Sequence, residues 1–115
     1  MKSIRIIAMA IVATVMSVTA ATSTGFIDGN TLYQSCISSV GGTYFLRSCR
    51  SYVLGVADGM LDNELDGYTA CLPAHVQISQ VEDVVTRFLA QHPERRHLRA
   101  NSLVARAISE SFPCR

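Results

Sequence analysis

The 115-residue sequence contains no tryptophan, and its only lysine is Lys2. Charged residues make up 17% of the chain, and the formal net charge is +1. A nearly neutral domain lacks the positive field that attracts nucleic acids and anionic membrane surfaces. The longest apolar stretch, residues 6–18, is shorter than the roughly 20 residues of a membrane-spanning helix. We therefore expect neither nucleic-acid binding nor stable membrane association.

The first 20 residues have the layout of a secretory signal peptide. Lys2 and Arg5 precede the apolar stretch, and Val18-Thr19-Ala20 offers small side chains to a signal peptidase. We expect cleavage after Ala20, which leaves residues 21–115 as a single exported domain. Without Lys2 and Arg5 this domain has 8 basic and 9 acidic residues, a formal charge of −1. No cysteine directly follows Ala20, so we do not expect a lipid anchor.

The remaining sequence shows the apolar spacing of amphipathic helices, without a long strand-like alternation. We predict an all-α fold, a small domain of four helices joined by short loops. Asp28 or Asn30 is a good N-cap for the first helix, and Gly41-Gly42 ends it. The third helix is expected to open with a capping box of Ser79 and Glu82. The predicted helices span residues 31–39, about 44–61, about 79–91 and about 100–111.

Each predicted helix carries one apolar stripe that should face the core. A domain of this size has a small core, so cross-links would add appreciably to its stability. The stripes are Leu32, Tyr33, Cys36, Ile37 and Val40; Phe45, Cys49, Tyr52, Val53, Val56, Ala57 and Met60; Val81, Val84, Val85, Phe88 and Leu89; and Leu103, Val104, Ala107, Ile108 and Phe112.

The chain has four cysteines and no Cys-x-x-Cys pair, and cysteines in an exported domain usually form disulfides. Four cysteines allow three pairings, which sequence alone does not decide. A hairpin of the first two helices would bring Cys36 to Cys49. Antiparallel third and fourth helices would bring Cys71, before the third, to Cys114, after the fourth. We therefore favour the disulfides Cys36–Cys49 and Cys71–Cys114.

The sequence offers little for catalysis. His92 and His97 flank Glu94, but zinc sites of the His-Glu-x-x-His type place the two histidines one helical turn apart. Here Pro93 interrupts the helix, which favours a turn in which Glu94 and Arg96 form local ion pairs. With all four cysteines oxidised no thiolate nucleophile remains, and there is no Gly-x-Ser-x-Gly motif. We expect no enzyme activity, no metal and no cofactor.

Gly55 and Gly59 lie four residues apart inside the second predicted helix, where each costs about 1 kcal/mol relative to alanine. Such a pair indicates close approach of another helix, either within the domain or across a dimer. We favour packing within the domain.

The loop Asp62-Asn63-Glu64-Leu65-Asp66-Gly67-Tyr68 places three carboxylates within five residues. Such a loop is most often a solvated connection. The alternative is a recognition surface in which Leu65 and Tyr68 add contact area and Asp62, Glu64 and Asp66 seek a basic or histidine-lined cleft.

An ordered set of short segments carries a family resemblance across residues 28–114. The segments are Asn30-Thr31-Leu32-Tyr33 before a cysteine, Tyr52-Val53-Leu54-Gly55-Val56-Ala57-Asp58-Gly59, Cys71-Leu72-Pro73, His92-Pro93-Glu94 with Arg96-His97-Leu98, Ser102-Leu103-Val104 and Phe112-Pro113-Cys114. Together they resemble the Rap/Tai family of immunity proteins. Arg99 departs from the pattern, which has a proline opening the last helix.

The resemblance implies a periplasmic inhibitor that is not itself an enzyme. Members protect bacteria from peptidoglycan amidases delivered by type VI secretion, and they often act as dimers. The implied partner is a papain-like cysteine amidase whose active-site cleft the immunity protein blocks. Within that reading, the acidic loop could occupy the cleft and pair with a protonated histidine.

Two other functions fit the same features: a small periplasmic chaperone or stress protein, and an exported scaffold without an enzyme target. A papain-like amidase gene beside this one favours inhibition, whereas a stand-alone locus favours the alternatives.

Overall fold

The described part of the chain folds into four α-helices, which confirms the all-α prediction. A computed structural model describes Ser17, residues 25–38 and residues 43–115, with side chains in the second helix described from Ser48 onward. The helices are α1 (Gly29–Ile37), α2 (Thr43–Gly59), α3 (Ile78–Gln91) and α4 (Ala100–Ser111), with a short 3₁₀ turn, η1 (Pro93–Arg95), between the last two. The predicted signal peptide, apart from Ser17, and the predicted stop at Gly41-Gly42 lie outside the described residues.

Two helices begin with side chains that satisfy free backbone N–H groups. At α1, Asp28 Oδ1 accepts a hydrogen bond from the Thr31 N–H at 2.8 Å, which lowers the pKa of this carboxyl. At α3, Gln80 Oε1 accepts from the Gln77 N–H at 2.8 Å, so the predicted capping box of Ser79 and Glu82 is wrong. The earlier start of α3 lets Ile78 pack against the core.

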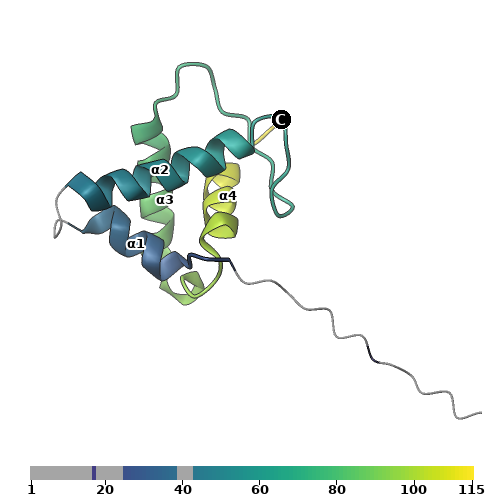
Figure 1. The fold of residues 1–115 in the computed structure, drawn as a ribbon. Coiled ribbons are helices and arrows are strands. Elements are labelled where there is room, and N and C mark those ends of the chain that lie inside the picture. The colour runs from purple at the N-terminus through teal and green to yellow at the C-terminus, as the bar shows by residue number, and fades with distance from the viewer. Residues whose placement is uncertain (1–16, 18–24, 39–42) are drawn as a thin grey trace, which may run out of the picture.

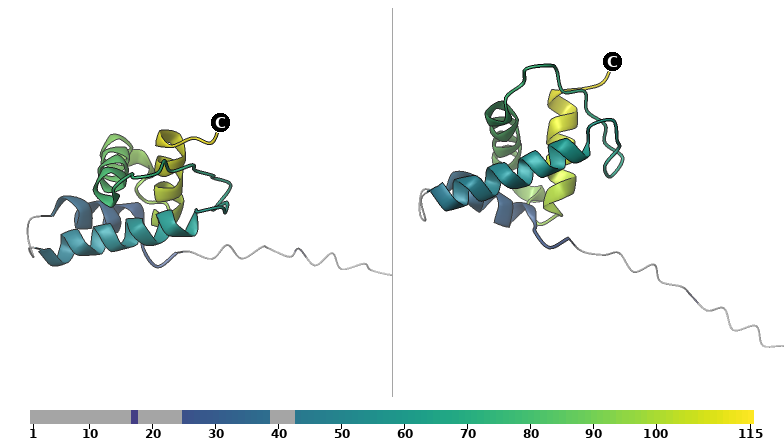
Figure 2. Two further views of the ribbon diagram at one scale, coloured as in Figure 1. Left: turned by 90° about the horizontal axis from the view of Figure 1, so that it is seen from above. Right: turned by 45° about the horizontal axis from the view of Figure 1, so that its top comes forward.

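The helices lie in two layers. The α1–α2 hairpin forms one layer and crosses over the antiparallel pair α3 and α4, as the two views of Figure 2 show. An ion pair joins the layers, because Arg50 Nε on α2 lies 2.8 Å from Glu82 Oε2 on α3. Figure 1 shows that the long connection from α2 to α3 runs past the C-terminus of the chain.

The core lies between the two layers and is built from the predicted stripes. Ile37 is an exception, because its side chain is 48% exposed at the end of α1. Val84 is half-buried at a pocket between α3 and α4, while Val40 and the Phe45 side chain lie outside the described part. The largest fully buried side chains are Met60, Leu89, Ile108, Val53, Val85, Val104 and Cys49.

Two disulfides join the elements, with the pairing that the sequence favoured. Cys36 on α1 bonds to Cys49 on α2, with 5.0 Å between their Cα atoms. Cys71, before α3, bonds to Cys114, after α4, across 4.9 Å between Cα atoms. Cys49 is fully buried, whereas Cys71 and Cys114 are exposed at the surface. A backbone hydrogen bond from the Cys71 N–H to the Phe112 carbonyl, at 2.8 Å, supports the second link.

The start of α1 fits tightly against the segment that leads into α4. The Gly29 N–H donates to the Leu98 carbonyl at 2.9 Å, and the Ala100 N–H donates to the Ile27 carbonyl at 2.9 Å. Gly29 is buried, and a Cβ atom at this position would collide with the Leu103 side chain and with the Arg96 backbone, whose carbonyl oxygen would be 2.8 Å away. We call this region, residues 27–30 and 96–100, the α1–α4 junction.

None of the described helices is long and apolar enough to cross a membrane.

Candidate partner interface

The acidic loop folds into a defined turn. Leu65 and Tyr68 exchange two backbone hydrogen bonds of 3.0 Å, and the residues between them, Asp66 and Gly67, have positive φ angles of 52° and 82°. A two-residue hairpin turn of type I′ requires positive φ angles at both central residues, and Asp-Gly is a preferred pair for these positions. The acidic loop is therefore a short hairpin with a fixed shape.

The side chains of the turn divide into two groups. Leu65 and Tyr68 are half-buried and pack against the core, so they anchor the turn from within. Because both side chains are only half-buried, their contact with a partner stays a prediction. The acids are exposed, although Asp66 Oδ1 lies 3.7 Å from Arg99 Nη2 at the start of α4.

Two carboxylates of the turn are left without a cation. Asp62 and Glu64 form no ion pair with any side chain that the structure describes. Asp62 has a φ angle of 58°, and the neighbouring Asn63 amide donates to the Leu61 carbonyl at 2.8 Å, which fixes the chain where it leaves α2. The structure thus brings Asp62 and Glu64 to the surface beside the C-terminal end of α2.

An apolar groove lies next to this acidic end. Leu54, Asp58 and Leu61 at the end of α2 form one side of it. The other side consists of Leu72 and Val76, from the α2–α3 connection, and Ile78 of α3. Its volume is about 260 Å³. Leu54 is 43% exposed and Leu61 is 50% exposed, so two large apolar side chains face solvent beside the groove. The exposure of these two leucines could not be predicted from the apolar spacing, because α2 has apolar residues on its buried and exposed sides alike.

The two glycines of α2 face away from the other described parts of the chain. A Cβ atom placed at Gly55 or Gly59 would meet nothing within 4 Å in the described structure. The preferred interpretation, close helix packing within the domain, is therefore wrong, because the buried stripe of α2 runs along the opposite side through Val53, Val56 and Met60. Close approach of a second molecule stays a prediction. Leu54, Gly55, Asp58, Gly59 and Leu61 together form what we call the outer face of α2.

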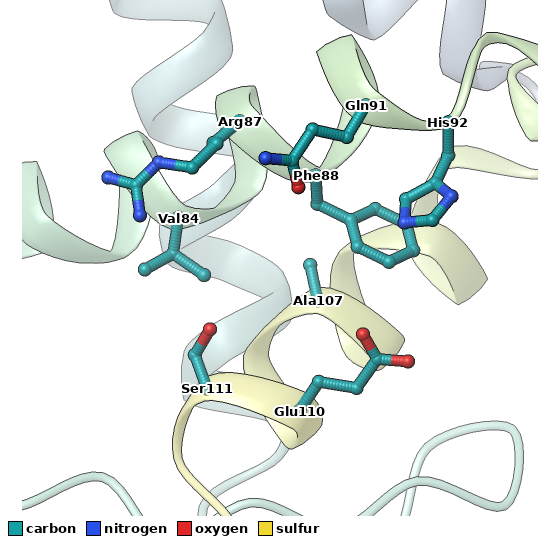
Figure 3. Close-up of a pocket in the computed structure, with 8 residues that line it drawn as sticks. All are labelled: Val84, Arg87, Phe88, Gln91, His92, Ala107, Glu110 and Ser111. Atoms are coloured by element: carbon teal, nitrogen blue, oxygen red, sulfur yellow. The ribbon is translucent and has the colours of Figure 1, made fainter.

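A second, more polar pocket of about 160 Å³ lies between α3 and α4. Figure 3 shows Phe88 and Gln91 from α3, with His92 directly after it, opposite Glu110 from α4. The His92 ring tilts against Phe88 at 4.5 Å between centroids, and its Nδ1 atom lies 3.1 Å from Glu94 Oε1. Glu110 Oε1 accepts from Arg106 Nε at 3.0 Å. His92 and Glu110 already have partners within the chain, so this pocket is a weaker candidate than the groove.

The segment around His92 and His97 forms a turn, as expected, but Glu94 has other ion-pair partners than the predicted one. Glu94 Oε1 lies 3.1 Å from His92 Nδ1 and 3.6 Å from Arg95 Nε, so Arg95 takes the place predicted for Arg96. The guanidinium of Arg96 instead lies over the Tyr33 ring, 4.2 Å from its centroid. The pKa of the Glu94 carboxyl is lowered, because this carboxylate accepts a hydrogen bond from the backbone N–H of Glu94 and a second from the His92 side chain. His97 is exposed, and no group of three or more metal-binding side chains occurs among the described residues.

The tight packing at Gly29 also could not be predicted from the spacing of apolar residues. Its neighbours at the junction come from Arg96 and Leu103, more than sixty positions along the chain. The signal that could have found it is its position directly after the N-cap Asp28, where a side chain was not needed for helix formation.

An open apolar groove beside unpaired carboxylates, held on a disulfide-linked helical scaffold, is a surface suited to binding another protein. The sequence matches the family of Rap1a immunity proteins over residues 28–114. Because the match covers most of the chain, this protein belongs to that family, and the resemblance found in the sequence is confirmed. Its family thus makes it an immunity protein whose partner is a cognate effector. No curated protein matches the sequence.

Proposed function

We propose that this protein acts in the periplasm, where it binds a type VI secretion peptidoglycan amidase and blocks its active-site cleft. The family match over residues 28–114 carries the proposal, because membership assigns an effector as the partner. In this proposal residues 1–20 are a signal peptide, and residues 21–115 form the mature domain. The two disulfides support the location, since such bonds persist in oxidising compartments such as the periplasm.

The acidic loop of residues 62–68, which we call the acidic turn, supplies a way to block a papain-like amidase. Such an enzyme uses a cysteine and a histidine, and the histidine is cationic when the cysteine is a thiolate. Asp62 and Glu64 are exposed, unpaired within the described part, and lie shortly before the Leu65–Tyr68 hairpin turn. A carboxylate in the cleft would form a charge-assisted hydrogen bond with that histidine. The peptide substrate also carries carboxylates, so the turn would compete for the same position.

The mature protein is proposed to act without enzyme activity of its own, either as a monomer or as a homodimer. Light scattering of the purified mature domain measures this oligomeric state directly. A dimer would double the number of acidic turns without changing the inhibitory contact.

The test uses the type VI papain-like amidase proposed as the cognate effector, which we call the candidate amidase. Replacement of Asp62, Glu64 and Asp66 by Ser should weaken inhibition at least about tenfold, since charge pairs buried at interfaces contribute strongly. Because Asp66 also pairs with Arg99, a second variant with only Asp62→Ser and Glu64→Ser separates inhibition from turn stability. Asp83→Ser is the control, because Asp83 is an exposed acid on α3 outside the turn.

Two outcomes would contradict different parts of the proposal. Unchanged inhibition by both acidic-turn variants would exclude the turn as the blocking element. Failure of the unmodified protein to bind or inhibit the amidase would exclude the amidase as its target.

A further inference from the structure

The groove at the end of α2 is a second contact surface, distinct from the acidic turn. We propose that it receives a segment of the effector in which a large apolar side chain neighbours a lysine or arginine. This inference rests on the proposed function, which supplies the effector as the partner. The acidic turn enters the cleft in that proposal, whereas the groove holds the effector outside the cleft.

The size and lining of the groove suit a protein side chain. Small-molecule sites usually enclose about 300–1,000 Å³. The groove measures about 260 Å³ and is open along Leu54 and Leu61, which are about half exposed. An aliphatic or aromatic side chain would cover these leucines and Leu72, which removes apolar surface from water.

The charge at the end of α2 calls for a cation. A helix C-terminus carries partial negative charge and is normally complemented by a basic side chain in the last turn. The last turn of α2 has no basic residue and holds Asp58, which also lines the groove. Asp62 and Glu64 follow within a few residues, exposed and unpaired among the described side chains.

These features oppose the stability of the free protein, so folding does not explain them. An acid at a helix C-terminus is unfavourable, and exposed leucines gain little from folding. Both disadvantages disappear when an apolar side chain enters the groove and a lysine or arginine lies beside Asp58. The apolar and charged preferences therefore occur together at one end of α2.

A second copy of this chain fits the groove less well than an effector segment does. A two-fold contact places the same patch of both copies face to face. Centred on this groove, it would bring the Asp58 and Asp62 carboxylates of both copies together. No basic side chain lines the described groove to separate them. Like charges opposed across an interface are strongly unfavourable.

Leu54→Ser with Leu61→Ser tests the apolar part of the groove. Both side chains are substantially exposed, so the double variant should keep its fold, which circular dichroism would verify. We expect calorimetric affinity for the candidate amidase to fall about 30-fold. The matched control is Ile37→Ser with Leu98→Ser, which removes similarly exposed apolar side chains elsewhere and should change affinity less than about twofold.

Asp58→Lys tests the charged part. The same calorimetry should show an affinity loss of about tenfold or more, because the substitution places like charges together. Asp83→Lys, at an exposed acid on α3, should leave the affinity within about twofold. Equal affinities of unmodified protein and both groove variants would overturn the inference while leaving the proposed function standing. Absence of binding by the unmodified protein would overturn both.

A photo-crosslinking amino acid at position 61 identifies the occupant. The expected product joins this position to an amidase peptide with a large apolar residue next to lysine or arginine, identified by mass spectrometry. The same probe at Asp83 should give no such product. Crosslinking to a second copy of this chain, in the presence of the amidase, would overturn the inference.

Discussion

The α1–α4 junction and the outer face of α2 both contain glycines and charged residues, but these residues differ in how they contact the other described parts of the chain. At the junction, Gly29 is buried with no space for a Cβ atom, and backbone hydrogen bonds of 2.8–2.9 Å surround it. On the outer face, Gly55 has nothing within 4 Å of its potential Cβ position, and Asp58 has no ion pair with a described side chain.

This comparison separates residues that explain the fold from residues that await another molecule. Gly29 and Ala100 of the junction contribute to packing and hydrogen bonding within the chain. Gly55, Asp58 and Leu61 instead have unfavourable or neutral effects on the isolated domain. The outer face of α2 is therefore where substitutions should change binding and stability in opposite directions.

The largest expected effect tests whether the two regions can be disturbed separately. Replacing Cys71 and Cys114 by Ser opens a link that spans 43 residues, for which loop entropy predicts a loss of about 4 kcal/mol. Since Leu72 and Pro73 line the groove, this region should loosen first. Hydrogen exchange should show faster amide exchange in residues 71–77 and a smaller loss of protection at the Gly29 amide. Equal loss of protection at both places would contradict the separation.

Gly29→Ala should be the most damaging single substitution at the junction. The added methyl group would overlap the Leu103 side chain and the Arg96 backbone, and overpacking of this kind costs about 1–3 kcal/mol. We expect the upper part of that range, because backbone atoms yield less than side chains. Urea unfolding measures the loss, and an unchanged midpoint would show that the junction is looser than described.

Gly55→Ala should have the opposite sign. A helical alanine is favoured over glycine by about 0.5–1 kcal/mol, and the new methyl group meets nothing within 4 Å in the described structure. Thermal unfolding of the variant should therefore occur at a higher temperature. If a partner approaches this face closely, the same variant should bind the amidase more weakly. A more stable variant with unchanged affinity would exclude close approach at Gly55.

Asp58→Asn should give the smallest change in stability. Removing negative charge from the last turn of α2 should stabilise the isolated domain by about 0.3–0.5 kcal/mol at low salt. Urea unfolding at low and high salt measures the difference, which should shrink as salt screens the charge. Destabilisation would show that Asp58 has a favourable role within the chain.

The sequence predicted the helices well because their apolar stripes are local patterns. The predicted end of α4 and the buried stripe of α2 through Val53 and Met60 agree with the structure. The two disulfides could be paired from the order of the helices. The start of α3 could not be predicted in this way. Glu82 pairs with Arg50 on another helix, and Gln77 is the N-cap residue in place of Ser79.

The candidate interface was predictable only in part. The acids at positions 62 and 64 could be identified as a surface feature from their spacing. The inward positions of Leu65 and Tyr68 follow from the hairpin turn, and that turn depends on how the whole connection packs on the core. Gly55 and Gly29 show the same limit, because the space around a glycine is set by residues distant in sequence.

Hydrogen exchange of this protein with and without the candidate amidase tests the central claim most directly. The outer face of α2 and the acidic turn should be covered in the complex. The account predicts slower exchange for amides of residues 58–64 and unchanged exchange for residues 96–100 of the junction. Slower exchange at residues 96–100, with residues 58–64 unchanged, would contradict it.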